Sequence, residues 1–148
     1  MTTIRTVTEL LTLGYLIGLS VYDIRYKRVT NTSLLLLLPA VFLIGITEIR
    51  SAGDMLSFLL GGLSGGGILL AAAMATKGGI GGGDIKLMTL LGLMAGLYDT
   101  LLILMTASVL ALLYGTVKRI VTHDKSLHIA FVPFLTLGYA VVTLIPIL

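Results

Sequence analysis

Two of the seven acidic residues stand where a carboxyl group could take part in chemistry. Asp23 directly follows the apolar stretch that ends in Val21-Tyr22, and Asp84 directly follows the glycine-rich run 77–83. Two carboxyls that meet in a partly desolvated place cannot easily both ionise, so one keeps its proton at neutral pH. Aspartyl proteolysis requires such a pair, because the charged member activates water while the protonated member polarises the scissile carbonyl.

Each aspartate also has an ordinary structural explanation. Asp23 could be neutralised in a surface loop by Arg25, Lys27 or Arg28. Asp84 could cap a helix, since aspartate accepts hydrogen bonds from the first backbone N–H groups. A cap does not require five glycines among the six residues before it, and such a run lets the backbone approach another segment closely. The glycines therefore favour a functional site at Asp84.

The other polar residues offer no comparable set. The sequence has no cysteine, which excludes disulfides, thiolate zinc sites and thiol catalysis. His123 and His128 flank one loop without metal-ligand spacing, so we expect neither a metal nor another cofactor. The remaining acidic residues fall at segment ends or beside basic residues: Glu9, Glu48, Asp54, Asp99 and Asp124. Four serines are isolated in apolar segments, where hydrogen bonding to the main chain is ordinary: Ser20, Ser57, Ser64 and Ser108.

The composition predicts the kind of protein that must position these carboxyls. Of 148 residues, 57% are hydrophobic and only 11% are charged, and the mean hydropathy is +1.08. A water-soluble chain of this size needs more charge on its surface. We therefore predict an all-α, polytopic membrane protein that forms one domain over residues 1–148, with the first apolar segment kept as a helix.

Six apolar segments predict a six-transmembrane-helix bundle. The fourth segment is too short to span a bilayer unaided, so we expect the glycine-rich loop before it to dip to membrane depth in a water-accessible cavity. Within the third, paired glycines at 61/65 and 62/66 favour close packing against a neighbouring helix. The segments are Thr6–Tyr22, Ser33–Thr47, Met55–Ala75, Ile85–Tyr98, Thr100–Val117 and Leu127–Leu148.

The basic residues predict the orientation. Eight of the ten lysines and arginines follow the first, third and fifth segments or begin the fourth, and only Arg5 and Arg50 lie on the opposite side. Positive charge favours the cytoplasmic side, so both aspartates are predicted there and both termini outside. The net charge of +3 is spread over short loops, which indicates anionic lipid as a partner and not a nucleic acid.

Three stretches resemble the type IV prepilin peptidases. Gly81-Gly82-Gly83-Asp84-Ile85-Lys86 matches their GxGD-x-K signature. The stretch 23–31, from Asp23 to Asn31, resembles their first-aspartate motif, with Thr30 in place of the usual proline. Residues 131–135, with Pro133, are similar to a Pro-Phe-Gly-Pro-Phe-Leu stretch near the last helix. The three matches keep the family's order and span nearly the whole chain.

The resemblance implies a function and a set of site residues. Asp23 and Asp84 would be the catalytic pair of an aspartic endopeptidase, with supporting or substrate-binding roles for Gly81, Gly83, Lys86, Asn31 and Pro133. The substrate would be a prepilin, a short basic leader ahead of a hydrophobic helix, cut at the cytoplasmic face of a bacterial or archaeal inner membrane. Lys86 could equally extend to the membrane interface and help to set topology. The oligomeric state is not predicted.

Because no cysteine is present, the chain resembles the short family members that process Flp or Tad pilins, without the zinc-binding region of the larger, N-methylating members. A Tyr22-Asp23 pair is also similar to presenilins and signal peptide peptidases, but there the two aspartate helices are adjacent, and here two segments intervene. Two other functions stay open: a small transporter or channel with intramembrane acids, and an assembly factor that binds pilins without cutting them.

Overall fold

The computed structural model describes residues 3–26, 29–76, 80–122 and 130–144. Several residues considered above lie outside these ranges: Lys27, Arg28, Lys77, Gly78, Gly79, His123, Asp124, Lys125 and His128. The described chain is all-α, as predicted. Its helices are α1 (Thr3–Tyr26), α2 (Asn31–Leu35), α3 (Leu38–Glu48), α4 (Ala52–Ala75), α5 (Gly82–Ala95), α6 (Leu97–Thr122) and α7 (Val132–Leu144).

The second predicted segment is one rod with a break in it. α2 and α3 follow each other closely, and together they form an apolar stretch of 18 residues, Asn31–Glu48. The break falls at Leu36 and Leu37 because Pro39 has no N–H to donate to the carbonyl of Leu35, and its ring crowds that carbonyl. Counting α2 and α3 as one, the described part of the chain has six helical rods, the number predicted.

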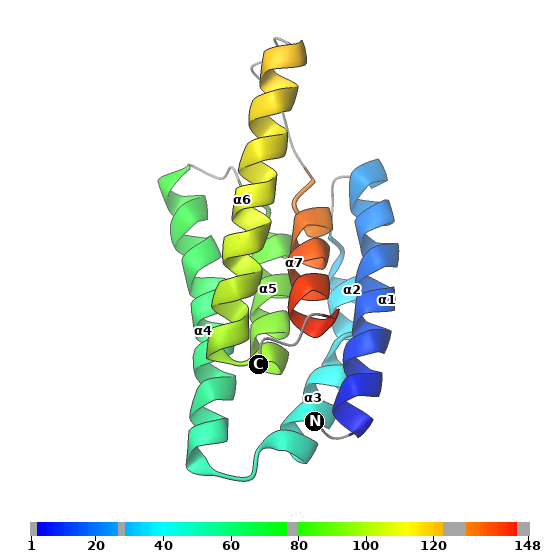
Figure 1. Ribbon diagram of the computed structural model, residues 1–148, viewed down its shortest axis with the longest axis vertical. Helices are drawn as coiled ribbons and strands as arrows, with labels where there is room; N and C mark the ends of the chain where they lie inside the picture. The colour runs from blue at the N-terminus through cyan, green and yellow to red at the C-terminus, as the bar shows by residue number, and fades with distance from the viewer. Residues whose placement is uncertain (1–2, 27–28, 77–79, 123–129, 145–148) are drawn as a thin grey trace.

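Successive rods run in opposite directions (Figure 1). α1, α4 and α6 rise toward the top of the view, whereas α2–α3, α5 and α7 descend. The end of α1 and the starts of α5 and α7 therefore lie at one end of the bundle, which we call the dyad end because Asp23 and Asp84 belong to it. The opposite end, where α1 begins and α7 stops, is called the far end.

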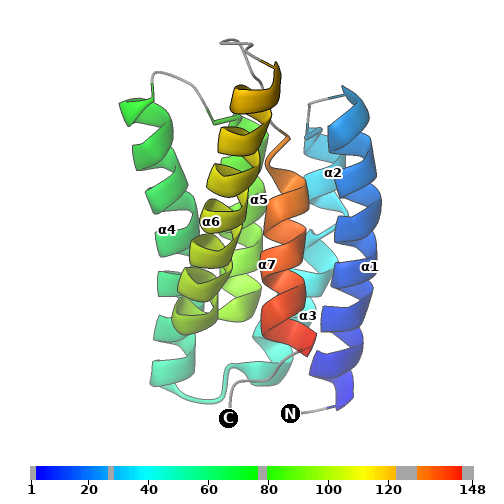
Figure 2. The ribbon, with the colours of Figure 1, turned by 45° about the horizontal axis from the view of Figure 1, so that its top comes forward.

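α5 lies in the middle of the bundle (Figures 1 and 2). It packs against α2, α3, α4 and α6, and its side chains Leu87, Met88 and Leu91 are completely buried. α7 lies between α1 and α6 and contributes Leu135 to the same core. Many large apolar side chains on the outer helix faces stay exposed, as expected for surfaces that face lipid.

The predicted glycine packing is confirmed between α4 and α5. A Cβ at Gly65 would lie 2.8 Å from the carbonyl oxygen of Met88, and one at Gly61 would collide with the backbone of Gly92. Only glycine lets the two helices come this close. Gly96 then ends α5 with φ of 82°, a backbone conformation that side chains disfavour.

Helix lengths differ from the sequence prediction in several places, since α1 and α6 have 24 and 26 residues and extend beyond the predicted segments Thr6–Tyr22 and Thr100–Val117. The rods α1, α2–α3, α4 and α6 are long and apolar enough to cross a membrane, whereas α5 has only 14 residues, as its short segment predicted. It runs three residues earlier than expected, from Gly82 instead of Ile85. Within the last predicted segment, α7 covers Val132–Leu144, and residues 127–129 and 145–148 lie outside the described ranges.

Candidate active site

Asp23 is buried between α1 and α7. It stands in the last turn of α1, and only 4% of it is exposed. Its Oδ2 accepts a hydrogen bond from the backbone N–H of Val132, the first residue of α7, at 3.3 Å. The carboxyl is therefore directed at the N-terminus of another helix. The exposed side chain of Arg25 does not pair with it.

The start of α7 leaves one backbone donor for this contact. The carbonyl of Phe131 accepts the N–H groups of Phe134 and Leu135, which closes the first turn. Pro133, the second helical residue, has no N–H at all. Val132 is thus the residue of this turn whose N–H points away from the helix, and Asp23 receives it. Pro133, expected from the resemblance to support the site, lies next to the contact.

A polar seam holds α7 in register on α1, one turn below Asp23. The hydroxyls of Ser20 and Thr136 lie 2.6 Å apart, and Thr136 also reaches the carbonyl of Leu16 at 3.3 Å. Ser20 bonds its own helix as well, as predicted, but it is not isolated. The sequence carried one signal for this seam. Ser20 precedes Asp23 by three residues, so both lie on one face of α1, and Thr136 follows Val132 by four, so both lie on one face of α7.

Asp84 is the third residue of α5 and is partly buried. The helix begins inside the glycine run, with Gly81 as its N-cap residue, so Asp84 lies within the first turn and is not the cap itself. Gly82 and Gly83 can be helical here because the first turn makes few backbone hydrogen bonds that glycine would weaken. The Asp84 carboxyl folds back toward Gly81, since a Cβ built on that glycine would lie 3.2 Å from its Oδ2.

The two carboxyls belong to one electrostatic unit. The charge of Asp23 acts directly on the Asp84 carboxyl, although the two residues are 61 positions apart in the sequence. Within the part of the chain that the structure describes, no lysine or arginine forms an ion pair with either of them. Two carboxyls that no described cation compensates can share one proton between them.

The glycines of the run have distinct environments. A Cβ at Gly81 would lie 3.2 Å from Oδ2 of Asp84, so a side chain there would press on the carboxyl. A Cβ at Gly83 would lie 2.6 Å from the Cβ of Val29, in the stretch that follows Asp23. Gly82 has nothing within 4 Å of such an atom. Gly83 therefore brings the two aspartate motifs into backbone contact.

Lys86 and Asn31 meet at the mouth of a groove beside Asp84. The Lys86 Nζ donates a hydrogen bond to Oδ1 of Asn31 at 3.2 Å, which links α5 to α2. Together with Thr89 and four leucines of α2, α3 and α5, they line a largely apolar cavity of about 410 Å³. We call this cavity the Lys86 groove. It begins on the same helix as Asp84 and continues away from the dyad end.

Residues 10–116, which include both aspartates, match the Type IV leader peptidase family. The chain belongs to the type IV leader peptidase family. Together with its four long apolar rods, membership makes it a multi-pass membrane protein.

A curated relative of this leader peptidase family member is the "Prepilin leader peptidase/N-methyltransferase" of Bacillus subtilis (strain 168). The two are 36% identical over 84 residues, which are 57% of this chain and 33% of the relative. The aligned part thus spans about a third of the relative's length. No solved structure matches the chain.

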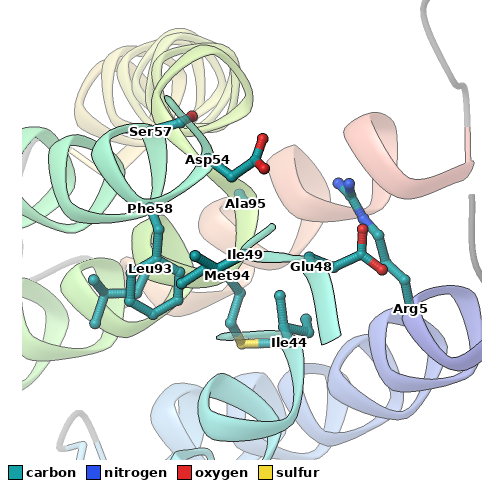
Figure 3. Close-up of a pocket in the computed structure, with 11 residues that line it drawn as sticks. Arg5, Ile44, Glu48, Ile49, Asp54, Ser57, Phe58, Leu93, Met94 and Ala95 are labelled. Carbon is teal, nitrogen blue, oxygen red and sulfur yellow. The ribbon is translucent and has the colours of Figure 1, made fainter. Parts of the chain in front are cut away.

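The far end of this leader peptidase family member also holds carboxyls, in a different setting. Figure 3 shows a cavity of about 150 Å³ lined by Arg5, Glu48 and Asp54 among other residues. Arg5 donates to Glu9 at 2.7 Å and lies 3.9 Å from Asp99. Asp54 forms a capping box with Ser51 at the start of α4. The predicted place at helix ends is confirmed for Glu48, Asp54 and Asp99. It is wrong for Glu9, which is buried in the second turn of α1 because α1 begins three residues before the predicted segment.

Proposed function

We propose that the protein is an aspartic endopeptidase that removes the leader from type IV prepilins, with Asp23 and Asp84 as its catalytic pair. One observation carries the proposal: two carboxyls from separate helices interact at one end of the bundle, and no cation among the described residues pairs with either. Family membership supports the same reaction. One carboxyl activates water and the other polarises the scissile carbonyl.

Several neighbouring residues support this pair in the proposal. Gly81 leaves room for the Asp84 carboxyl, and Gly83 lets α5 approach Val29. Pro133 removes a competing donor at the start of α7. Each therefore fixes where a carboxyl lies without touching the substrate.

Lys86 and Asn31 have a proposed role in substrate binding. The Lys86 groove starts two residues beyond Asp84 and is apolar along most of its length. A substrate cut between the carboxyls can lay the apolar segment after the cleavage point along this groove. The exposed ammonium and amide at its mouth can bind main-chain carbonyls of that segment. Lys86→Met would then raise KM more than it lowers kcat.

The proposal extends to the setting of the reaction. All six rods cross the bacterial or archaeal inner membrane, with the dyad end on the cytoplasmic side, where eight of ten basic residues are expected. Anionic lipid on that side holds the basic leader. The substrates are of the Flp or Tad type, as the resemblance to the short, cysteine-free family members implies.

The decisive experiment is leader cleavage by the purified full chain in lipid nanodiscs, with a prepilin from the same genome as substrate. Asp23→Asn and Asp84→Asn should each lower the rate by at least about a thousandfold, because each removes a proton-transfer group. Asp54→Asn, at the far end, is the matched control and should keep the rate within about twofold. Cleavage at normal rates by either dyad variant would exclude the mechanism.

Other outcomes would point to the other functions. Binding of the prepilin without turnover by the unaltered chain would favour an assembly factor. Proton or cation flux into liposomes that depends on Asp84, with no cleavage, would favour a transporter.

A further inference from the structure

The backbone N–H of Val132 distinguishes the two carboxyls. Asp23 receives this N–H from the first turn of α7 and is almost completely buried. The N-terminus of a helix carries a partial positive charge, and its unpaired N–H groups stabilise an anion. A hydrogen bond to an ionised carboxyl favours the ionised form over the protonated one.

We propose that α7 assigns the charge within the dyad: Asp23 is the ionised member, and Asp84 carries the shared proton. Val132 is then a positioning residue that acts through its main chain. This inference rests on the proposed peptidase function, and it adds which carboxyl is ionised and which is protonated before the reaction.

The groups that face Asp23 agree with this assignment. From α5 it faces Asp84, which tends to lose its own charge while Asp23 is ionised. From α7 it faces the Val132 amide, and Thr136 lies a turn below on the same helix. Lys86 bonds Asn31, and Arg25 is exposed on α1. The described charged groups therefore leave the α7 amide as the contact that sets Asp23 apart.

The resulting reaction balances. Water attacks the scissile carbonyl carbon and gives one proton to Asp23, while Asp84 gives its proton to the carbonyl oxygen, which yields a gem-diol. The C–N bond then breaks, the leaving nitrogen takes the proton from Asp23, and Asp84 recovers a proton from a gem-diol hydroxyl. The products are a carboxylic acid and an amine, and the dyad returns to its starting form.

Direct titration tests the assignment independently of cleavage. The full chain, labelled with carbon-13 at the aspartate carboxyls, is titrated by NMR in nanodiscs, and each signal is assigned by its loss in an Asp→Asn variant. As the pH falls from neutral, the Asp84 signal should already report the protonated form while Asp23 remains ionised. The reverse order would overturn the inference, even if the enzyme cleaves prepilin as proposed.

Val132→Pro removes the N–H and places an apolar ring of similar size in the same completely buried position, and proline suits the first position of a helix. Loss of one hydrogen bond to a charged group should move the Asp23 titration, and the acid limb of the cleavage profile, upward by about one pH unit. Val132→Ala keeps the N–H and should not move either. An unshifted Asp23 signal in a folded Val132→Pro variant would contradict the inference. If that variant does not fold, the order of titration in the unaltered chain decides.

Discussion

Both ends of the bundle hold carboxyls near the ends of helices, yet they differ in what surrounds them. At the far end, Glu9 and Asp99 share Arg5, and Asp54 binds the hydroxyl and backbone of Ser51. At the dyad end, no described cation pairs with either carboxyl, and Asp23 accepts a backbone N–H from the start of α7.

The difference separates structural carboxyls from chemical ones. An arginine beside a carboxyl supplies a full countercharge, so the pair stabilises the fold. A backbone N–H supports a carboxylate without a full countercharge. Among the described residues, the dyad end therefore keeps two carboxyls without a cationic partner, and the far end keeps carboxyls held by an arginine or a capping serine.

The largest expected effect is at Asp84, where a substitution should remove activity and leave stability intact. Asp84→Asn should abolish cleavage and leave the thermal unfolding temperature in detergent nearly unchanged, because asparagine has the shape of the protonated carboxyl and no described cation pairs with Asp84. A large loss of thermal stability would contradict the comparison, since Asp84 would then be a structural carboxyl like those of the far end.

Arg5→Gln should show the opposite pattern. It leaves Glu9, which is 8% exposed, without its partner, and should lower the free energy of unfolding by about 2 to 3 kcal/mol. The folded fraction should still cleave at a near-normal rate per molecule. Arg25→Gln is the matched control on the same helix, and because Arg25 is exposed its unfolding free energy should change by less than about 0.5 kcal/mol. Equal effects of the two variants would remove the contrast between the ends.

Gly83→Ala tests whether the dyad depends on backbone contact. The added methyl would meet Val29 and push α5 away from the stretch after α1, at a cost of about 1 to 3 kcal/mol and of about tenfold or more in cleavage rate. Gly82→Ala, one residue earlier, is the matched control. Nothing lies within 4 Å of the added carbon there, so this variant should be neutral or slightly stabilising. Chemical unfolding and cleavage assays measure both. Identical behaviour of the two alanines would argue against the contact.

The smallest effect belongs to the far end. Ser51→Ala removes the hydroxyl that accepts the N–H of Asp54 and should lower the free energy of unfolding by about 1 kcal/mol, with cleavage unchanged. A marked loss of cleavage would mean that the start of α4 is coupled to the dyad end.

Much of this arrangement could be predicted from the sequence because it depends on local signals. Apolar segments alternate with short polar clusters, so Asp23 and Asp84 had to fall at one end once the rods were counted. The spaced glycines of the third segment predicted close packing, and α4 packs on α5 through them. The shortness of α5 also followed from its own residues.

Other features depend on contacts that no local pattern encodes. Val132 N–H reaches Asp23 across 109 positions, and Ser20 meets Thr136 across 116. Such pairs follow from how α7 packs against α1, and serine and threonine in apolar helices usually bond only their own main chain. The break before α3, in contrast, has a local signal: Pro39 lies inside the segment predicted as one helix and forces the break.

The length of α5 has a consequence for the surrounding bilayer. Fourteen helical residues rise about 21 Å, whereas the hydrocarbon layer is about 30 Å thick. The helix at the centre of the bundle is therefore several ångströms shorter than the hydrocarbon layer, and a thinner bilayer or water must make up the difference. Asp84 stands in the first turn of this short helix, and the proposed reaction requires water to reach it at that depth. A peptide bond could then be hydrolysed in a local thin spot of the membrane, while the chain beyond it stays at the depth of the acyl tails.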